Sequence, residues 1–332
     1  MRIHVSNLFA VAALIALVSF SAQAQTVKTQ IAFPQFVQGI AASPATNQIY
    51  VVVVSGTSTS DTLAVINGST DTVVANIPVP AGAYVPAVNV LTNRVYIATC
   101  NYLVDPTPCS VTVVDGNTGT VVASVPVTTT PGGGLLGIVV DPITFNVYVA
   151  NASDNVIDII SGFKNRIVGT INLNGAAPQG LGFNAFNREL YITFGTNQIG
   201  IVNTAKKHPV VAMASVGNTT YNAAANLASG NVFVTDTQYD TGTTDVLSAN
   251  GTALAQVAVD PNPWGVDVDP ITNLAFVANS EFGSVTAIDG STNTATAASP
   301  IEDVPALFVA VNFATEKVYV AGSQYVTVLT EK

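Results

Sequence analysis

A unit of short strands and turns repeats through most of the chain, and this periodicity limits the fold more than any other feature. The clearest copy, 264–289, reads WGVDVDPITNLAFVANSEFGSVTAID. Its segments 265–268, 274–278 and 284–288 are apolar, β-branched or alternating, and the turn sequence DPITN and a polar loop separate them. The turn DGST then leads to a weaker fourth segment, 294–298. Because no helical period is present, each copy predicts four short antiparallel strands that form one sheet.

Seven copies of this unit can be aligned on one aromatic residue in the second predicted strand. These marker aromatics are Tyr50, Tyr96, Tyr148, Tyr191, Phe233, Phe276 and Tyr319, at steps of 42 to 52 residues. A repeat of about 40 to 50 residues is typical of a four-stranded propeller blade. One sheet cannot bury both of its faces, whereas several sheets packed side by side can. The sequence therefore predicts an all-β fold, a seven-bladed β-propeller of four-stranded antiparallel blades.

Short sequence runs also connect the chain with a known family of repeats. VYVAN (147–151), AFVAN (275–279), VDGNTGTVV (114–122) and IDGSTNTAT (288–296) resemble the YVTN-family β-propeller repeat. The resemblance covers about residues 26 to 332. It implies the propeller fold and an exported or surface-layer protein, and it names no activity.

The two ends of the repeat region complement each other. Thr26 to Phe33 is a predicted strand that belongs to no copy, while the last copy stops after its third strand, Tyr325 to Leu329. If the N-terminal strand completes the last blade, the ring closes and two sheet edges are hidden. No linker or change of composition divides the chain, so residues 25–332 are predicted to form a single domain.

The first 24 residues have the features of a signal peptide. Arg2 and His4 precede an apolar run from Leu8 to Phe20, and Ala22-Gln23-Ala24 is a small-x-small cleavage sequence. The apolar run has 13 residues, too few to cross about 30 Å of hydrocarbon. We therefore expect a mature chain that begins at Gln25, is periplasmic, extracellular or on the cell surface, and does not insert into the membrane.

The charge balance excludes some classes of partner. Without Arg2 the chain has nine basic and twenty acidic side chains, a net charge near −11, and charged residues are only 9% of the full sequence. Phosphate binding requires a basic stripe. We therefore expect neither nucleic acid nor anionic lipid as a partner.

The two cysteines flank a predicted hairpin loop. In an exported chain, Cys100 and Cys109 indicate a disulfide. A metal site would need further soft ligands nearby, and a catalytic thiol would need a histidine partner. His208, beside two lysines, is the one histidine after residue 24.

Loop lengths point to a binding face. In a propeller, the loops that enter the innermost strands and the loops between second and third strands share one side, here called the loop face. The turns after the first and third strands share the other side, the turn face. The sequence places every long loop, such as 54–61, 99–110 and 236–244, on the loop face. Insertions on one face commonly mark the binding face.

Residues that enter the innermost strands are predicted to surround the channel mouth on the loop face. They are Gln38, Pro86, Leu136, Gln179, Tyr221, Trp264 and Phe308. Among them, two amides and three aromatics suit a neutral ligand such as a glycan, or the loop of a partner protein; these candidates are Gln38, Gln179, Tyr221, Trp264 and Phe308. The alternative is that each side chain only covers the neighbouring blade.

Enzymatic alternatives have less support in the sequence. Propellers that act as lactonases or lyases use an inner ring of acidic residues, amides or histidines, often with a divalent metal. Asp267 and Asp269, two residues apart on one strand face, are weak candidate metal ligands, because a hard cation takes six or more oxygens. Gly132 to Gly137 satisfies G-x-G-x-x-G, but a predicted strand follows where a dinucleotide site needs a helix.

These observations favour an exported, non-catalytic binding module that recognises a protein partner or a neutral glycan through the loop face. No cofactor, metal or catalytic residue is expected on this hypothesis. Two alternatives remain: a metal-assisted enzyme of the lactonase or lyase type, and a structural component of a surface layer.

Overall fold

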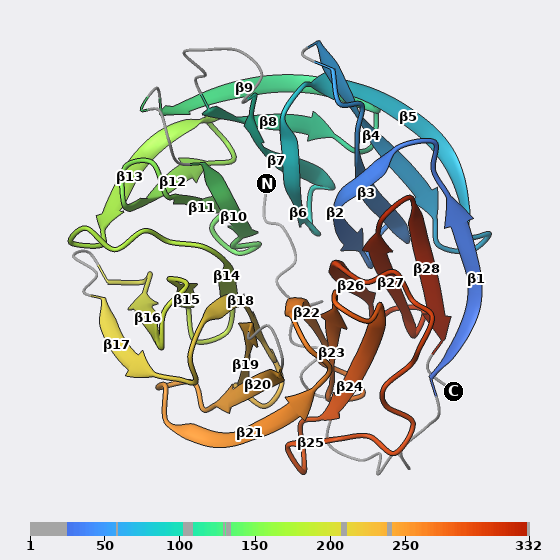
Figure 1. Ribbon diagram of the computed structural model, residues 1–332. Helices are drawn as coiled ribbons and strands as arrows, with labels where there is room; N and C mark the ends of the chain where they lie inside the picture. The colour runs from blue at the N-terminus through green and yellow to red at the C-terminus, as the bar shows by residue number, and fades with distance from the viewer. Residues whose placement is uncertain are drawn as a thin grey trace.

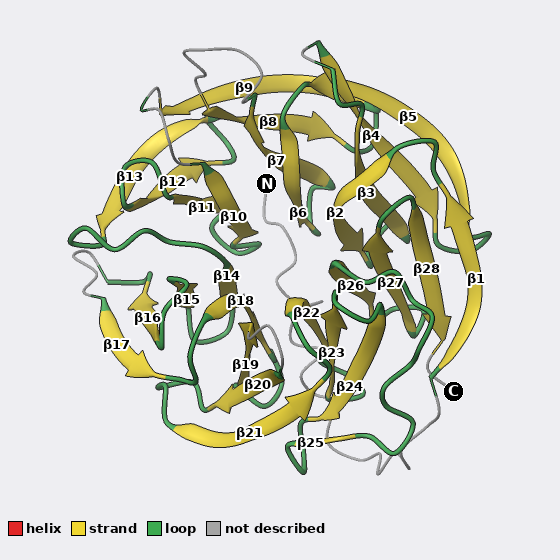
Figure 2. Ribbon diagram, in the orientation of Figure 1, coloured by secondary structure: helices red, strands yellow, loops and turns green. Residues whose placement is uncertain are grey.

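The computed structural model describes residues 25–57, 59–101, 109–128, 130, 134–206, 211–237 and 241–330. Seven four-stranded antiparallel sheets stand in a ring around a central axis (Figure 1). Every regular element within the described ranges is a strand (Figure 2), and no helix there is long and apolar enough to cross a membrane. The predicted seven-bladed β-propeller is confirmed. The predicted signal peptide, His208, Gly132 and Gly133 lie outside the described residues.

The strands take four positions in the blades, from the axis outward. The innermost are β2 (Phe36–Ser43), β6 (Ala83–Asn89), β10 (Leu135–Val140), β14 (Leu181–Asn184), β18 (Thr220–Ala225), β22 (Pro263–Asp269) and β26 (Phe308–Asn312). The second are β3 (Gln48–Val54), β7 (Arg94–Cys100), β11 (Asn146–Asn151), β15 (Glu189–Thr193), β19 (Val232–Thr237), β23 (Leu274–Asn279) and β27 (Lys317–Gly322). The third are β4 (Ser60–Asn67), β8 (Cys109–Asp115), β12 (Val156–Ser161), β16 (Gln198–Asn203), β20 (Gly242–Leu247), β24 (Ser284–Asp289) and β28 (Tyr325–Thr330). The outer are β5 (Thr72–Pro80), β9 (Thr120–Thr128), β13 (Arg166–Asn172), β17 (Ala212–Ser215), β21 (Ala253–Val259), β25 (Thr294–Ala295) and β1 (Thr26–Ala32).

The core is a ring of contacts between blades. All seven marker aromatics are at most 1% exposed. One apolar cluster joins Ile49 and Val51 of blade 1 to Tyr319 and Val328 of blade 7. Another cluster joins blade 1 to blade 2 in the same way. Because each blade covers a face of the next, no blade can bury its own apolar surface alone.

The N-terminal strand closes the ring, as predicted. The last sheet has the order β1-β28-β27-β26, and β1 pairs along β28 from Thr26 opposite Thr330 to Ala32 opposite Tyr325. Figure 1 shows the first and last strands side by side at the edge of the ring. The pairing places the start of β1 on the turn face.

Two local predictions were wrong. The outer strand of blade 6, expected over 294–298, has two residues, because the chain turns after Ala295 and Ile301 instead pairs with Val285. The expectation that every long connection lies on the loop face fails in blade 4. There β16 ends at Asn203 and β17 begins at Ala212, so a connection of eight residues starts and ends on the turn face.

The turns after the first strand share one geometry in all seven blades. In blades 2, 3, 4, 5 and 6, an Asn or Asp at the strand end accepts backbone N–H groups two and three residues later; these residues are Asn89, Asp141, Asn184, Asn226 and Asp269. Each turn starts at Ser43, Asn89, Asp141, Asn184, Asn226, Asp269 or Asn312. The residue four positions after this start has positive φ in every blade: Asn47, Asn93, Phe145, Arg188, Gly230, Asn273 and Glu316. A left-handed residue closes each turn, and in blades 2 to 6 a side-chain cap supports it.

Candidate binding site at the channel mouth

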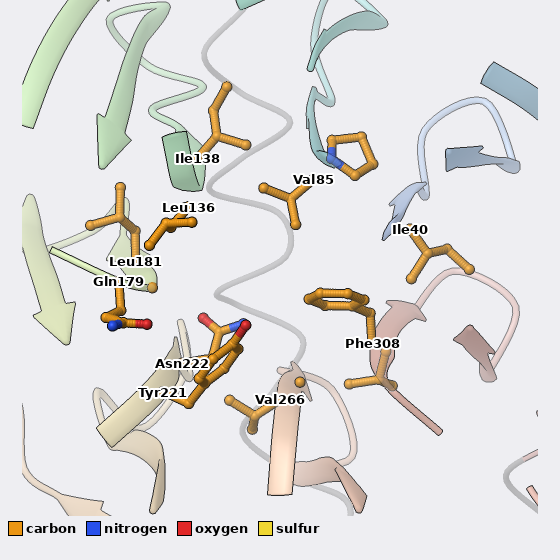
Figure 3. Close-up of a pocket in the computed structure, with 15 residues that line it drawn as sticks. Ile40, Val85, Leu136, Ile138, Gln179, Leu181, Tyr221, Asn222, Val266 and Phe308 are labelled. Carbon is orange, nitrogen blue, oxygen red and sulfur yellow. The ribbon is translucent and has the colours of Figure 1, made fainter. Parts of the chain in front are cut away.

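Three cavities follow the propeller axis from one face to the other. The first, near the loop face, has a volume of about 100 Å³ and is lined by inner-strand residues that include Gln179, Tyr221 and Phe308. Figure 3 shows these side chains arranged around the central space. The next, of about 310 Å³, shares several lining residues with the first and adds Asp267. The third, of about 230 Å³, opens among the turns of the turn face.

Strand register identifies equivalent residues at the mouth. In every blade, the residue that follows the marker aromatic pairs with one residue of the innermost strand. These inner-strand residues are Ile40, Pro86, Ile138, Leu181, Ala223, Val266 and Val309. Two residues earlier lie Gln38, Tyr84, Leu136, Gln179, Tyr221, Trp264 and Leu307. Five of the seven predicted mouth residues are therefore equivalent. Pro86 lies two residues past the equivalent position in its strand, and Phe308 lies one residue past it. Both still line the axial cavity.

Backbone bulges lie near the mouth in five of the seven blades, whereas β26 of blade 7 pairs with β27 without a register shift. The register shifts at this point in β2, β6, β10, β18 and β22. A bulge leaves a residue outside the ladder and changes the direction of its side chain. In β6 the shift falls between Ala83 and Pro86, so Tyr84 is outside the ladder. Tyr84 is the mouth residue that sequence reasoning missed; a count back from the marker aromatic would have found it.

Four aromatic side chains from four blades form a cluster across the mouth. Tyr221 packs on Trp264 with ring centroids 4.2 Å apart, and Phe308 lies edge-on to both Trp264 and Tyr84, at 6.5 and 6.0 Å. The hydroxyls of Tyr84 and Tyr221 are hydrogen-bonded at 3.2 Å. Blades 2 and 5 are not neighbours, so this bond crosses the channel.

Neighbouring blades fix the backbone of the cluster. The Thr193 hydroxyl donates to the Tyr221 carbonyl at 2.7 Å, and the Thr235 hydroxyl donates to the Trp264 carbonyl at 3.1 Å. A Cβ on Gly265 would lie 2.8 Å from the Phe308 Cα, so glycine is needed for this close approach of two inner strands. The aromatic positions are thus set by inter-blade packing.

The tyrosines at the mouth are neutral hydrogen-bonding groups at physiological pH. Burial raises the pKa of Tyr84, and the hydrogen bond with Tyr221 only partly offsets this. Burial, followed by the interaction with Tyr84, raises the pKa of Tyr221. Only one of the two O–H groups can donate within the pair, so the other can donate to a ligand.

The predicted amides lie in two adjoining cavities. Gln179 lines the axial cavity, whereas Gln38 lines a separate cavity of about 370 Å³ on the loop face, together with Tyr84, Leu136 and Cys100. Neither side-chain amide has a hydrogen-bond partner in the described part of the protein. The lining that the structure describes contains no charged residue in either cavity. Trp264 contacts the rings of Tyr221 and Phe308 and is not itself part of the axial lining.

The disulfide lies beside the loop-face cavity that Gln38 lines. Cys100 and Cys109 are opposite each other on β7 and β8, with Cα atoms 4.4 Å apart, and form the predicted bond. Both are buried in the cluster between blades 2 and 3. Their bond connects the ends of the β7–β8 loop and so supports one wall of the cavity.

The two candidate metal ligands are engaged with the backbone. Asp267 accepts the Val311 N–H at 2.8 Å from the next blade, and Asp269 accepts the Ile271 and Thr272 N–H groups of its own turn. Burial raises the pKa of Asp267 to about 6. No group of three or more metal-ligating side chains occurs in the described ranges. Asp267 borders the second and third axial cavities, away from the mouth.

Comparison with known proteins supports the fold and goes no further. No family model matches this sequence. No curated protein matches it either. Among solved structures, the chain is similar to one of Kuenenia stuttgartiensis hydrazine synthase, with a TM-score of 0.70 and 16% identity over 91% of this chain and 97% of that one. What they share is the propeller. At this identity nothing about activity is transferred, and the resemblance to the YVTN repeat stays a prediction.

Proposed function

We propose that this protein is an exported, non-catalytic binding module whose loop-face mouth recognises a neutral glycan. One observation carries the proposal: the mouth combines an aromatic cluster with two amides that have no hydrogen-bond partner among the described residues, and the described lining of both cavities has no charged residue. Aromatic rings offer apolar faces to the C–H groups of a sugar, and amides and phenols exchange hydrogen bonds with its hydroxyls.

The uncharged lining sets the expected selectivity. Gln38 and Gln179 each offer two N–H donors and one carbonyl acceptor, and the Tyr84–Tyr221 pair retains a donor. None of these groups compensates the charge of an acidic sugar, and the chain as a whole has a net charge of −10. A uronic or sialic acid would lose hydration without gaining a cationic partner. Neutral sugars are therefore favoured over acidic ones.

The test is a thermal-shift screen of the mature chain, with matched neutral and acidic oligosaccharides. A neutral glycan is expected to raise the melting temperature, and Trp264→Ala and Gln179→Ala are expected to abolish the increase. Phe163→Ala is the control, because this aromatic is 70% exposed and lies on the turn face. If no neutral glycan raises the melting temperature, or if the two mouth variants respond like the wild type, the assignment is wrong. Retention of an envelope protein by the wild type, lost in Trp264→Ala, would assign the mouth to a protein loop.

Export is part of the same proposal. The Cys100–Cys109 disulfide is compatible with an oxidising compartment, and residues 1–24 have the pattern of a signal peptide. Cell fractionation followed by N-terminal sequencing tests both points. The expected product is outside the cytoplasm and begins at Gln25, whereas a cytoplasmic product that begins at Met1 would refute export.

A further inference from the structure

The connection from β13 to β14 carries an exposed Asn-Gly turn on the loop face. Asn174 and Gly175 are both exposed and both left-handed, with φ angles of 54° and 89°. The residues on either side hold the turn in place: Leu173 is buried in the apolar cluster between blades 3 and 4, and its carbonyl accepts the Ala176 N–H at 3.1 Å. The dipeptide itself therefore projects into solvent.

The reactive groups of this dipeptide have no partner among the described residues. The Asn174 side-chain amide makes no hydrogen bond there, and neither does the Gly175 N–H. A Cβ added to Gly175 would meet no atom within 4 Å, so the space beside the peptide bond is open. The Asn174 side chain and the Gly175 nitrogen can therefore approach each other without losing a contact.

Hydrogen bonds hold the other sequences of this kind. The chain has four further Asn-Gly or Asp-Gly pairs, at 67–68, 115–116, 250–251 and 289–290. In each of them, the glycine N–H donates to a backbone carbonyl at 2.8 to 2.9 Å. The Asn or Asp side chain of each pair also accepts a backbone N–H of its own turn. Among these five described pairs, only 174–175 has both groups without a partner.

We propose that Asn174 is a site of spontaneous deamidation and isomerisation, with water as the only co-reactant. The Gly175 nitrogen attacks the Asn174 Cγ: a new N–Cγ bond forms, the bond from Cγ to the side-chain nitrogen breaks, and ammonia leaves with the proton of the glycine N–H. Water then opens the resulting succinimide. Opening at Cγ gives aspartate, and opening at the main-chain carbonyl gives isoaspartate. No step is an oxidation or a reduction.

The hydrogen bonds of the folded chain select which pair reacts. The glycine nitrogen reaches Cγ only after the intervening main chain rotates, and at the four held pairs this rotation breaks two hydrogen bonds. Reaction there is expected to be about tenfold or more slower than at Asn174. Each event at Asn174 replaces a neutral amide with a carboxylate on the loop face. Isoaspartate also adds a methylene to the main chain of the connection that leads to Gln179.

Peptide mapping by mass spectrometry tests the proposal on residues 25–332, incubated in the folded state at mildly alkaline pH. Asn174 is expected to become a mixture of aspartate and isoaspartate, whereas Asn67 and Asn250 stay largely unchanged over the same period. The matched control is the same chain in concentrated guanidinium chloride, where the three Asn-Gly pairs should react at similar rates. The comparison separates the effect of the fold from that of the dipeptide.

Isoelectric focusing gives a second measurement. The wild type is expected to acquire a more acidic band with age, and Asn174→Gln is expected to remove most of that shift, because a glutamine side chain closes the ring far more slowly. Asn250→Gln, at another exposed Asn-Gly pair, should leave the shift unchanged. Reaction of Asn67 or Asn250 as fast as Asn174 in the folded protein would overturn the proposal. So would an unmodified Asn174 over a period in which the unfolded chain reacts. Neither readout involves a ligand at the mouth, so the result is independent of the glycan proposal.

Discussion

At the scale of single residues, the turn geometry places unequal demands on the seven blades. The residue four positions after the start of each of these turns is left-handed in every blade. Three blades use Asn there and one uses Gly, the residues that tolerate positive φ best. Phe145, Arg188 and Glu316 occupy the same conformation at a higher cost. Phe145 stacks on Phe163 and Arg188 pairs with Asp141, whereas no comparable contact involves Glu316 in the described structure.

Glu316→Asn is therefore expected to stabilise the protein. Asn relieves the left-handed strain. Burial is the main cause of the raised pKa of Asp269, and removing the Glu316 carboxylate takes away a like charge that adds to it. The gain should be about 0.5–1 kcal/mol in the free energy of unfolding, measured as a higher midpoint in urea. Ala314→Asn, in the same turn but without positive φ, is the control and should not stabilise. A Glu316→Asn variant equal to or below the wild type would contradict the strain argument.

Asp71 is the residue that fastens the first and last blades together. This buried carboxylate accepts hydrogen bonds from the Lys28 ammonium at 2.6 Å, from the Lys317 ammonium at 2.9 Å and from the Tyr319 hydroxyl at 2.9 Å. Burial acts to raise the pKa of Asp71, but the bonds from Lys28, Lys317 and Tyr319 together lower it below its ordinary value. The carboxylate form is thus the one that the fold requires.

Asp71→Ala should cost about 3–5 kcal/mol of stability, because Lys317 is left buried without its counter-ion. Since the folded pKa of Asp71 is lowered, its contribution is complete above the ordinary value of 3.8 and is lost as the pH falls through the folded value. Urea unfolding at neutral pH and below pH 3.8 measures both effects. The difference between wild type and variant should shrink at the lower pH. An undiminished difference would refute the assignment, and Glu302→Ala, an exposed carboxylate, is the control.

At the scale of elements, the side chains of β1 are largely exposed, yet this strand completes a sheet. It supplies the fourth strand of blade 7 and also the Lys28 contact to blade 1. Its importance comes from the backbone pairing and the edge that it covers, because an unpaired β28 would offer its N–H and C=O groups to other chains.

Removing residues 25–32 should lower the melting temperature by about 10 °C or more and promote aggregation, because loss of β1 exposes an edge strand. The experiment compares residues 25–332 with residues 33–332 by thermal unfolding and light scattering. A synthetic peptide of residues 25–34, added to the shorter chain, should restore part of the lost stability by pairing with β28. A scrambled peptide is the control. A shorter chain as stable as the intact one would show that ring closure does not depend on β1.

At the scale of the whole molecule, blade 7 contains strands from both ends of the chain, and this blade closes the ring. Thr26 and Thr330 are paired, with hydroxyl oxygens 3.3 Å apart, so the ends can be joined by a short linker. When the original ends are joined and the chain is opened elsewhere, the position of the new termini decides whether one blade is still built from both ends of the chain.

Two circular permutants, opened only ten residues apart, separate these cases. Opening between Lys164 and Asn165 begins the chain at outer strand β13 and ends it at β12, so blade 3 is closed by both ends. Opening between Asn174 and Gly175 leaves every blade continuous, and no strand is shared between the ends. The first permutant is expected to unfold at a higher temperature by several degrees, about 1–2 kcal/mol. Equal melting temperatures would mean that packing between blades is sufficient.

Sequence and structure contributed differently to the candidate site. Alignment on the marker aromatics located Gln38, Gln179, Tyr221 and Trp264, because each is defined within its own repeat. Tyr84 was missed because Pro86 was taken as the mouth residue of blade 2, although Tyr84 stands the same number of residues before Tyr96 as Gln38 does before Tyr50. The Tyr84–Tyr221 bond joins residues 137 positions apart, and nothing local to either residue indicates it.

The sequence by itself determined the number of blades, the marker aromatics, the closure by residues 26–33 and the disulfide. Each of these follows from contacts within one repeat or between matching repeats, which periodicity records directly. Only the tertiary structure decided what meets across the axis and between neighbouring blades: the aromatic cluster at the mouth and the pairing of Arg188 with Asp141. These depend on bulges and on the radius of the closed ring, properties of seven blades packed together that no single repeat contains.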